Sequence, residues 1–553
     1  MVEDQNLDWQ EHAACTNVDA FFAAHSQLKE EIGKKTGLRG VRFGRDLMIM
    51  VDKCIRSKTP QKDLTEMVLS LAPIVILGQG KLSDDFWSAI KKDAQHLSDI
   101  RWKQCRPRAL WGVTPIVMLN EFVHADRKCG YEAESLVFST YYITSKFDHV
   151  LEKHTEEISG AGPELDRIFR WVCLIWVIMR YDVINLFNDR GIIEPAGGYG
   201  SEFFGIAIAE MDLYQEVGKM FYTHAYGADH RMREKTLASG MFNFCMDCPA
   251  PGTHCVCDDA GGKKMLAEIA RRATVMFATG LAAEQIPGAR NIYNLAVDTD
   301  RIRPPAKPRN PCKSASRSLR VGHFPNHGFF KGTRYLIAAI ERLQKDGFAI
   351  ELVQLSGLPQ SEIINAMRDV DIVVDQLISG SFGLTGLEAM ALAKPVICHL
   401  KDNVAIAESE NCPVIRANPE TIAGELRAFA NSRRNELWKI GLESRAYVLR
   451  NYSIDAFASR LASVHAKHDP LPQLAGKALR QHAILLRNET LNDGTHWREF
   501  AKKSVDTNRP LTSENRTLDL RKIAKTKKSK RTSVSGKILG KVITIFDGIY
   551  KSH

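Results

Sequence analysis

The residues with the clearest chemistry lie between Phe382 and Ile397, where a glycine-bearing turn opens a short helix that carries Glu388. The segment before it, Asp-Ile-Val-Val-Asp at 371–375, predicts a buried strand. A strand, a glycine turn and a helix start present backbone N–H groups and a positive dipole end to an anion. A carboxylate one or two turns into that helix can accept hydrogen bonds from hydroxyls. The pattern therefore predicts a ligand that joins a phosphate to a sugar.

A second segment, which precedes the first in the sequence, contributes a cation. Residues 321–325 read as the end of a strand, and Lys331 precedes the Gly-Thr that opens the next helix. Together the two segments resemble the donor-binding region of the two-domain (GT-B) glycosyltransferases, especially the retaining family-4-like group. The family pattern Glu-Gly-Phe-Gly-Leu-x-x-Leu-Glu is matched at Gly383, Leu384, Leu387 and Glu388. In this pattern Gly380 replaces the first glutamate, and in the upstream segment Asn326 replaces the arginine that usually lies five residues before the lysine.

The resemblance implies a role for each matched residue. Lys331 would contact the donor diphosphate, together with the backbone N–H groups and helix dipole at Gly383, Leu384 and Thr385. Glu388 would bind the ribose of the nucleotide. In the family, the first glutamate lies close to the transferred sugar. Here that position is Gly380, which cannot offer a carboxylate to the sugar. Asp375 or Gln376 takes over that contact, or Asp375 ends its strand without a ligand; both interpretations stay open.

Polar residues also follow a strand in the first half of the chain. Residues 108–112, 181–187 and 219–224 read as strands, and Asp229 and His230 lie beyond the last of them. In GT-B enzymes such strand ends supply the acceptor side of the cleft. Asp229 and His230 would then orient an acceptor hydroxyl or stabilise the departing diphosphate. A purely structural histidine is an equally good interpretation.

Strands that alternate with helices predict an α/β chain with parallel, doubly wound sheets. With the resemblance, this gives a GT-B fold of two Rossmann-like domains that face a cleft. The expected divisions are a helical extension at 1–104, an acceptor-side domain at 105–315, a nucleotide-sugar-binding domain at 316–470, and a linker with a basic tail at 471–553. Helices are expected at 23–34 and 84–94, a strand and linker at 291–298, and a hinge at the proline-rich residues 304–308.

Four cysteines form a dense cluster, Cys245, Cys248, Cys255 and Cys257. Two close thiol pairs on a turn-rich loop can bind a structural zinc ion tetrahedrally, although the spacing is short for known zinc modules. Four reduced thiols are the alternative. A zinc ion held by four thiolates has no open position for catalysis, so its role would be structural.

Composition and charge favour a soluble protein, with 44% hydrophobic and 25% charged residues. The chain starts without an apolar run, and its longest such run, 171–179, is too short to span a bilayer. We therefore expect a cytoplasmic protein. Residues 516–553 carry eleven Lys/Arg and two Asp, so nearly all of the net charge of +10 lies there. A basic stretch at 521–531 and an amphipathic helix at 537–549 favour an anionic membrane surface over nucleic acid as a partner.

The function that this resemblance implies is transfer of a sugar from a nucleotide diphosphate sugar to an acceptor hydroxyl, with retention of configuration. The acceptor would be a glycan or lipid-linked precursor at the cytoplasmic face of a membrane. No catalytic metal is expected, because no Asp-x-Asp site is placed to hold one. Two alternatives stay open: a non-catalytic scaffold that keeps the fold, which Gly380 and Asn326 favour, and a nucleotide-sugar epimerase of similar shape.

Overall fold

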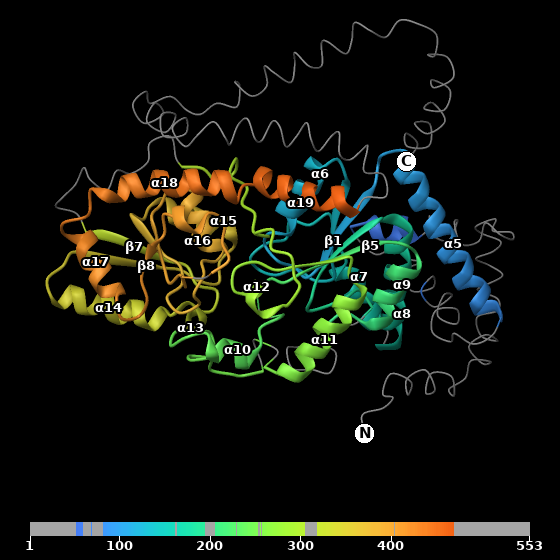
Figure 1. Cartoon of the computed structure of the whole chain (residues 1–553), viewed down its shortest axis with the longest axis horizontal. Coiled ribbons are helices and arrows are strands. Elements are labelled where there is room, and N and C mark those ends of the chain that lie inside the picture. Colours follow the sequence, from blue (N-terminus) through green and yellow to red (C-terminus); the bar gives the residue numbers. More distant parts are fainter. Residues whose placement is uncertain are drawn as a thin grey trace, which may run out of the picture. The chain divides into compact units, whose positions relative to one another are not determined.

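The computed structural model describes residues 51–58, 68, 81–160, 163–193, 205–227, 229–252, 255, 257–304, 318–402 and 404–468 (Figure 1). All of them belong to one compact unit, residues 1–498. The helix expected at 23–34, the basic stretch at 521–531 and the amphipathic helix at 537–549 lie outside the described residues. No helix in the described part of the chain is long and apolar enough to cross a membrane.

The first sheet is parallel throughout and has the order β3-β2-β1-β4-β5-β6. This order reverses direction between β1 and β4, which is the switch point of a doubly wound sheet. The strands are β1 (Arg108–Val113), β2 (Glu132–Val137), β3 (His149–Val150), β4 (Val183–Phe187), β5 (Met220–His224) and β6 (Val275–Phe277).

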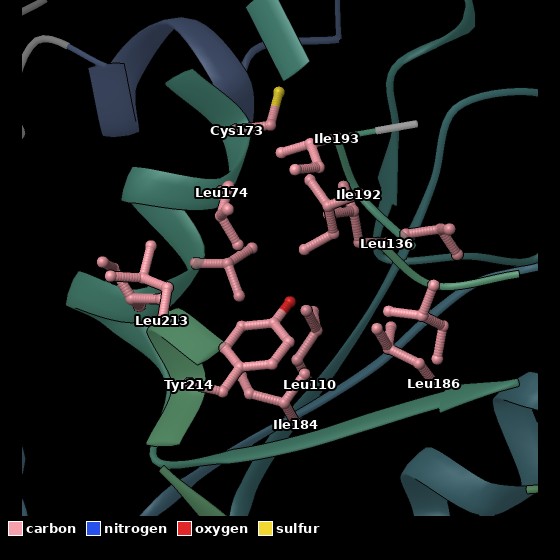
Figure 2. Close-up of a cluster of buried hydrophobic side chains, with 14 of the residues drawn as sticks. Leu110, Leu136, Cys173, Leu174, Ile184, Leu186, Ile192, Ile193, Leu213 and Tyr214 are labelled. Carbon is pink, nitrogen blue, oxygen red and sulfur yellow. The ribbon is translucent and has the colours of Figure 1, made fainter. Parts of the chain in front are cut away.

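Helices cover this sheet because its strands are apolar on both faces: every residue of β4 and β5 is buried. The helices are α5 (Lys81–Lys103), α6 (Leu119–Lys128), α7 (Glu152–Gly160), α8 (Pro163–Arg180), α9 (Ile208–Glu216), α10 (Arg233–Ala238), α11 (Asp259–Arg272) and α12 (Ala282–Gln285). The middle of α8 is apolar around its whole circumference, and residues 172–179 are all buried. Figure 2 shows part of this core, where side chains of α8 gather with those of β1 and β4.

The second sheet is also parallel, with the order β11-β10-β9-β7-β8 and a switch point between β7 and β9. Its strands are β7 (Leu319–His323), β8 (Ile350–Gln354), β9 (Ile372–Val374), β10 (Val396–Cys398) and β11 (Ile415–Arg416). The helices that follow β7 to β11 are α13 (Gly328–Lys331), α14 (Thr333–Lys345), α15 (Gln360–Arg368), α16 (Leu384–Ala391), α17 (Ile422–Ala430), α18 (Glu436–Asn451) and α19 (Ile454–His468).

The last described helix, α19, returns from the second sheet to the first and packs on α6 (Figure 1). Phe457 and Leu461 of α19 share a hydrophobic core with Trp111 of β1. His465 adds a buried polar contact, with its Nε2 2.7 Å from Asp126 Oδ1 of α6. The stretch expected to form the second domain therefore ends on the first sheet.

The predicted fold class is confirmed: the chain is α/β, with two parallel, doubly wound sheets. The strands expected around residues 108–112, 181–187, 219–224 and 371–375 are present within two or three residues of those bounds. Residues 291–298 differ, because they are irregular and form only one isolated bridge, between Val297 and Ser453. Here the Val297 N–H donates to Tyr452 O at 2.8 Å, at the junction of α18 and α19, instead of to a neighbouring strand.

Candidate functional site

A cavity of about 740 Å³ lies where the carboxyl ends of both sheets converge. Parallel α/β sheets bind ligands at this edge, beside the switch point. Residues that follow β1, β5 and β6, with Phe187 at the end of β4, line it from the first sheet, and residues that follow β7, β9 and β10 line it from the second. The cavity therefore brings together groups from Pro115 to Tyr452 in the sequence, and its volume is that of a ligand pocket.

The first-sheet side of the cavity has an apolar wall, and Arg231 and Lys235 also line this side. Its wall includes Ile116, Phe122, Phe187 and Tyr226. The carboxylate at this switch point, Asp189, is buried and lies outside the lining. It accepts hydrogen bonds from Thr114 Oγ1 at 2.7 Å and from Arg190 Nε at 3.0 Å. Burial raises the pKa of Asp189.

Asp229 and His230 follow β5, and the structure places them in contact. Asp229 is fully buried, and its Oδ1 accepts hydrogen bonds from the N–H of Tyr226 at 3.1 Å and of Gly227 at 2.8 Å. The same oxygen lies 2.9 Å from His230 Nδ1. His230 lines the cavity, whereas Asp229 lies behind it. Asp229 thus fixes the loop and the orientation of the His230 ring, while His230 is the group that can meet a ligand.

On the second-sheet side, Asp375 joins Lys331 to the start of α16. Its Oδ1 accepts from Lys331 Nζ at 2.7 Å, and its Oδ2 accepts from the Gly383 N–H at 2.6 Å. Asp375 therefore satisfies one of the backbone donors that every helix start leaves open. The helix approaches so closely that a Cβ on Gly386 would lie 2.8 Å from Asp375 Oδ2. Lys331 and Gly383 line the cavity, but the fully buried side chain of Asp375 does not.

Gln376 and Leu384 also line the cavity, whereas Thr385 is partly buried and does not. The Gln376 Nε2 donates to Ser381 O at 2.7 Å, which holds the loop between β9 and α16. The NH2 group of the side-chain amide is thereby engaged by the loop. The Oε1 atom of the same amide is the group that can contact a ligand.

Glu388, the residue expected to bind the ribose, is buried and is absent from the cavity lining in this structure. Gln360 of α15 donates its Nε2 hydrogen bond to Glu388 Oε1 and covers the carboxylate. Gln360 is itself held by Arg301, whose Nη2 donates to its Oε1 at 3.2 Å and also lies 3.4 Å from Glu121 Oε1. Burial raises the pKa of Glu388 and that of Glu121 to about 7.

The cysteine cluster lies close to the cavity through Arg231. The Arg231 Nη1 donates to Cys255 Sγ at 3.1 Å, and the guanidinium stacks 3.8 Å from the centre of the Phe244 ring. Burial raises the pKa of Cys245 and that of Cys255. Among the described residues, no group of three or more His, Cys, Asp or Glu side chains is arranged to hold a metal ion. A zinc ion bound by Cys245, Cys248, Cys255 and Cys257 stays a prediction.

Lys401 is a cavity residue that the sequence did not point to. It follows β10 by three residues, and Gly380 packs against its side chain. A signal was available, because a lysine just beyond a parallel strand falls on the ligand-binding edge of the sheet.

Comparisons with known proteins concern the fold alone. No protein-family model and no curated protein matches the chain. Among solved structures, it is similar to sucrose-phosphate synthase from Thermosynechococcus elongatus, at 12% identity and a TM-score of 0.43, over 66% of this chain and 98% of that one. It is also similar to HepE from Anabaena in complex with UDP-glucose, at 11% identity and a TM-score of 0.40, over 65% and 99% of the two chains.

A third similar structure is a glycosyltransferase from Rickettsia africae, at 13% identity and a TM-score of 0.41, over 66% of this chain and 98% of that one. The assignment of the fold does not rest on these similarities. The two strand orders, with a cavity at the carboxyl ends of both sheets, are what identify the two-domain GT-B architecture.

Proposed function

We propose that the protein is a glycosyltransferase that moves a sugar from a nucleotide diphosphate sugar to an acceptor hydroxyl. The observation that carries this proposal is that Lys331 and the α16 N-terminus at Gly383 border the same cavity and share Asp375 as anchor. A cation beside a helix start suits the diphosphate of such a donor. The cavity lies at the edge of both sheets where Rossmann-like folds bind nucleotides.

In the proposed reaction, the bond between the anomeric carbon and the diphosphate oxygen breaks, and the acceptor oxygen bonds to that carbon while its proton passes to the departing diphosphate oxygen. The diphosphate leaves with the electron pair. Lys331 and the N–H groups at the start of α16 stabilise the charge that develops on the diphosphate. His230 enters the cavity from the opposite sheet and either orients the acceptor hydroxyl or donates to the leaving diphosphate. Retention of configuration and independence from metal ions are parts of the proposal.

The apolar wall supports an acceptor with an apolar part. Ile116, Phe122 and Phe187 face the cavity from the first sheet, and Phe330 faces it from the second. Sugar hydroxyls do not need such a wall, whereas a lipid-linked glycan precursor does. This acceptor would place the protein at the cytoplasmic face of a membrane, where the basic residues of 516–553 would bind anionic lipid.

If Glu388 binds the ribose, as the resemblance implies, the donor must first displace Gln360. Gln360 also donates its backbone N–H to Ile143 O, at 3.1 Å, which links α15 to the first half of the chain. Donor binding through Glu388 would therefore require the two halves to separate locally. Hinge opening around a ligand site is common in two-domain enzymes.

Calorimetry and thermal shift with UDP-, GDP-, ADP- and dTDP-sugars test the proposal. We expect one nucleotide to bind, and Lys331→Met to weaken its binding by about 10-fold to 100-fold, the value of one charge-assisted hydrogen bond. Lys345→Met, on the exposed end of α14, is the matched control. If the folded protein bound none of these donors, the scaffold would be favoured. Epimerisation of the donor without an acceptor would favour the epimerase.

A further inference from the structure

The side chain of Lys401 is held in place by a glycine. Its aliphatic stem lies across Gly380, where an added Cβ would meet Lys401 Cε at 2.8 Å, Cγ at 2.9 Å and Cδ at 3.0 Å. The backbone joins the same two residues, since the Lys401 N–H donates to Gly380 O at 3.0 Å. Gly380 has a φ of +87°, a conformation that residues with a side chain rarely adopt. Both constraints favour glycine at this position and direct the lysine into the cavity.

The Lys401 ammonium group has no hydrogen bond or ion pair within the described part of the chain, although the cavity partly buries the side chain. The neighbouring carboxylate does not serve it, because Asp402 pairs with Arg416 at 2.7 Å. Burial lowers the pKa of Lys401, and Glu284, another cavity residue, partly opposes this effect. A cation that is partly removed from water without a close anion is unfavourable by itself.

The other cations of the cavity are already engaged. Lys331 is paired with Asp375, and Arg231 donates to the Cys255 thiol. Lys235 donates to Gln285 O at 3.1 Å. Lys401 thus differs from them because its ammonium group has no hydrogen-bond or ion-pair partner among the described residues.

One anchored loop, residues 376–383, separates Lys401 from Lys331. At one end the Leu377 N–H donates to Lys331 O at 3.0 Å, and further along Gly380 contacts Lys401. Inside the loop, Ser379 Oγ donates to Ser381 O at 2.7 Å. The loop therefore presents two cations to one cavity at fixed, separate positions. A ligand whose diphosphate lies at Lys331 and the α16 start would have a different group at Lys401.

We propose that Lys401 binds a carboxylate on the transferred sugar, so that the donor is a nucleotide diphosphate uronic acid. This inference rests on the proposed function and specifies its donor. The carboxylate of a hexuronic acid lies several bonds from the diphosphate, which matches a second cation held at another point of the loop that contacts Lys331. Thr279 and Ser381, also in the lining, offer hydroxyls to the neutral part of the sugar. An anionic group on the acceptor is the other source of the same chemistry.

Binding without an acceptor distinguishes the two sources. Calorimetry compares UDP-glucose with UDP-glucuronate, and GDP-mannose with GDP-mannuronate, each against the free nucleoside diphosphate. We expect the uronate of one pair to bind about tenfold more tightly than the neutral sugar. Lys401→Met should abolish this preference, because it should weaken the binding of the uronate about tenfold more than the binding of the neutral donor. Lys345→Met should keep the preference, and Lys401→Arg should keep part of it because the charge remains.

Gly380→Ala provides a second route to the same outcome without a change of charge. Its methyl group displaces the Lys401 stem, so the uronate preference should fall while Lys401 is still present. Equal affinity for uronate and neutral sugar in the unmodified protein would overturn the inference and leave the proposed function intact. So would an equal loss for the free diphosphate and both sugars in Lys401→Met, which would assign Lys401 to the diphosphate. Absence of binding to every nucleotide in the folded protein would overturn both.

Discussion

The two sheets place a buried carboxylate at the same point of their topology but use it differently. Asp189 follows β4 at the first switch point, and Asp375 follows β9 at the second. Asp189 lies outside the cavity and accepts from Thr114 and Arg190, which do not line it, and at 3.3 Å from the Tyr226 hydroxyl, which belongs to a lining residue. Asp375 accepts from Lys331 and Gly383, both of which line the cavity. Equivalent positions in two sheets thus have mainly structural partners in the first sheet and cavity-lining partners in the second.

The difference extends to the walls of the cavity. The first half contributes an apolar wall, with Ile116 and Phe187, together with the cations Arg231 and Lys235, whereas the second contributes Lys331, Lys401 and the start of α16. A fold that is repeated twice therefore yields two unlike walls: the extended apolar surface lies on one side only, and the lysine beside a helix start lies on the other. Under the proposed function, the donor would lie against the second sheet and the acceptor against the first.

Replacing each of the two carboxylates by an amide tests the difference between the two switch points. These substitutions should have the largest effects on stability. Asp189→Asn and Asp375→Asn each leave a partner cation without its anion, so each should reduce the free energy of unfolding by about 3 kcal/mol. Urea denaturation measures this loss. The affinities should separate the two variants: Asp375→Asn should bind the nucleoside diphosphate several-fold more tightly, because a carboxylate 2.7 Å from Lys331 Nζ no longer repels it.

Asp189→Asn should leave the same affinity unchanged, since Asp189 does not border the cavity. Equal changes of affinity in both variants would show that the two switch points are not functionally distinct. A stability loss below about 1 kcal/mol in both would show that neither carboxylate is a structural anchor.

The sequence predicted the strand, glycine turn and helix start that follow β9 because their signals are local; anion binding there stays a prediction. Asp375, Gly383 and the start of α16 lie within ten residues, and a strand, turn and helix fix their relative positions. The sequence did not predict what covers Glu388, because Gln360 belongs to another helix and is held by Arg301. It also missed Lys401, whose orientation depends on the missing side chain of Gly380. Both the covering of Glu388 and the orientation of Lys401 depend on contacts between segments that are distant in the sequence.

The junction between the two halves should respond to pH. Glu388 of the second half and Glu121 of the first are buried carboxyl groups whose pKa is raised to about 7. In the unfolded chain a glutamate has its ordinary pKa of 4.5. Below pH 4.5 both states are protonated and nothing is lost. Between pH 4.5 and about 7 the unfolded chain ionises first, so stability falls as the pH rises, by at most roughly 1.4 kcal/mol per pH unit for each group.

Glu388→Gln should remove its share of this loss. An amide oxygen still accepts the Gln360 hydrogen bond, so the variant should match the unmodified protein near pH 5 and exceed it by about 2 kcal/mol at pH 8. Urea denaturation across this pH range measures the difference. Glu341→Gln, on the exposed face of α14, should show no such gain. A pH-independent difference for Glu388→Gln would mean that Glu388 is ionised in the folded protein.

The smallest expected effect is on stability and concerns two buried threonines of the first sheet. One has a hydrogen-bond partner for its hydroxyl, and the other has none among the described residues. Thr114 Oγ1 donates to Asp189 Oδ1 at 2.7 Å, whereas Thr223 of β5 is fully buried and its hydroxyl has no hydrogen-bond partner among the described residues. Thr114→Val should cost about 1 kcal/mol, because it removes a donor from a buried carboxylate. Thr223→Val should be neutral or slightly stabilising, since no bond is lost and a polar group leaves the core.

Thermal and urea unfolding of the two valine variants measure these costs under the same conditions. Both substitutions keep the side-chain shape, so the difference between them isolates the hydrogen bond to Asp189. Nucleotide affinity should stay unchanged in both, because neither threonine lines the cavity. Equal stabilities would mean that Asp189 does not depend on Thr114. A weaker nucleotide affinity in Thr114→Val would instead connect the first switch point to the donor, against the division of roles between the two sheets.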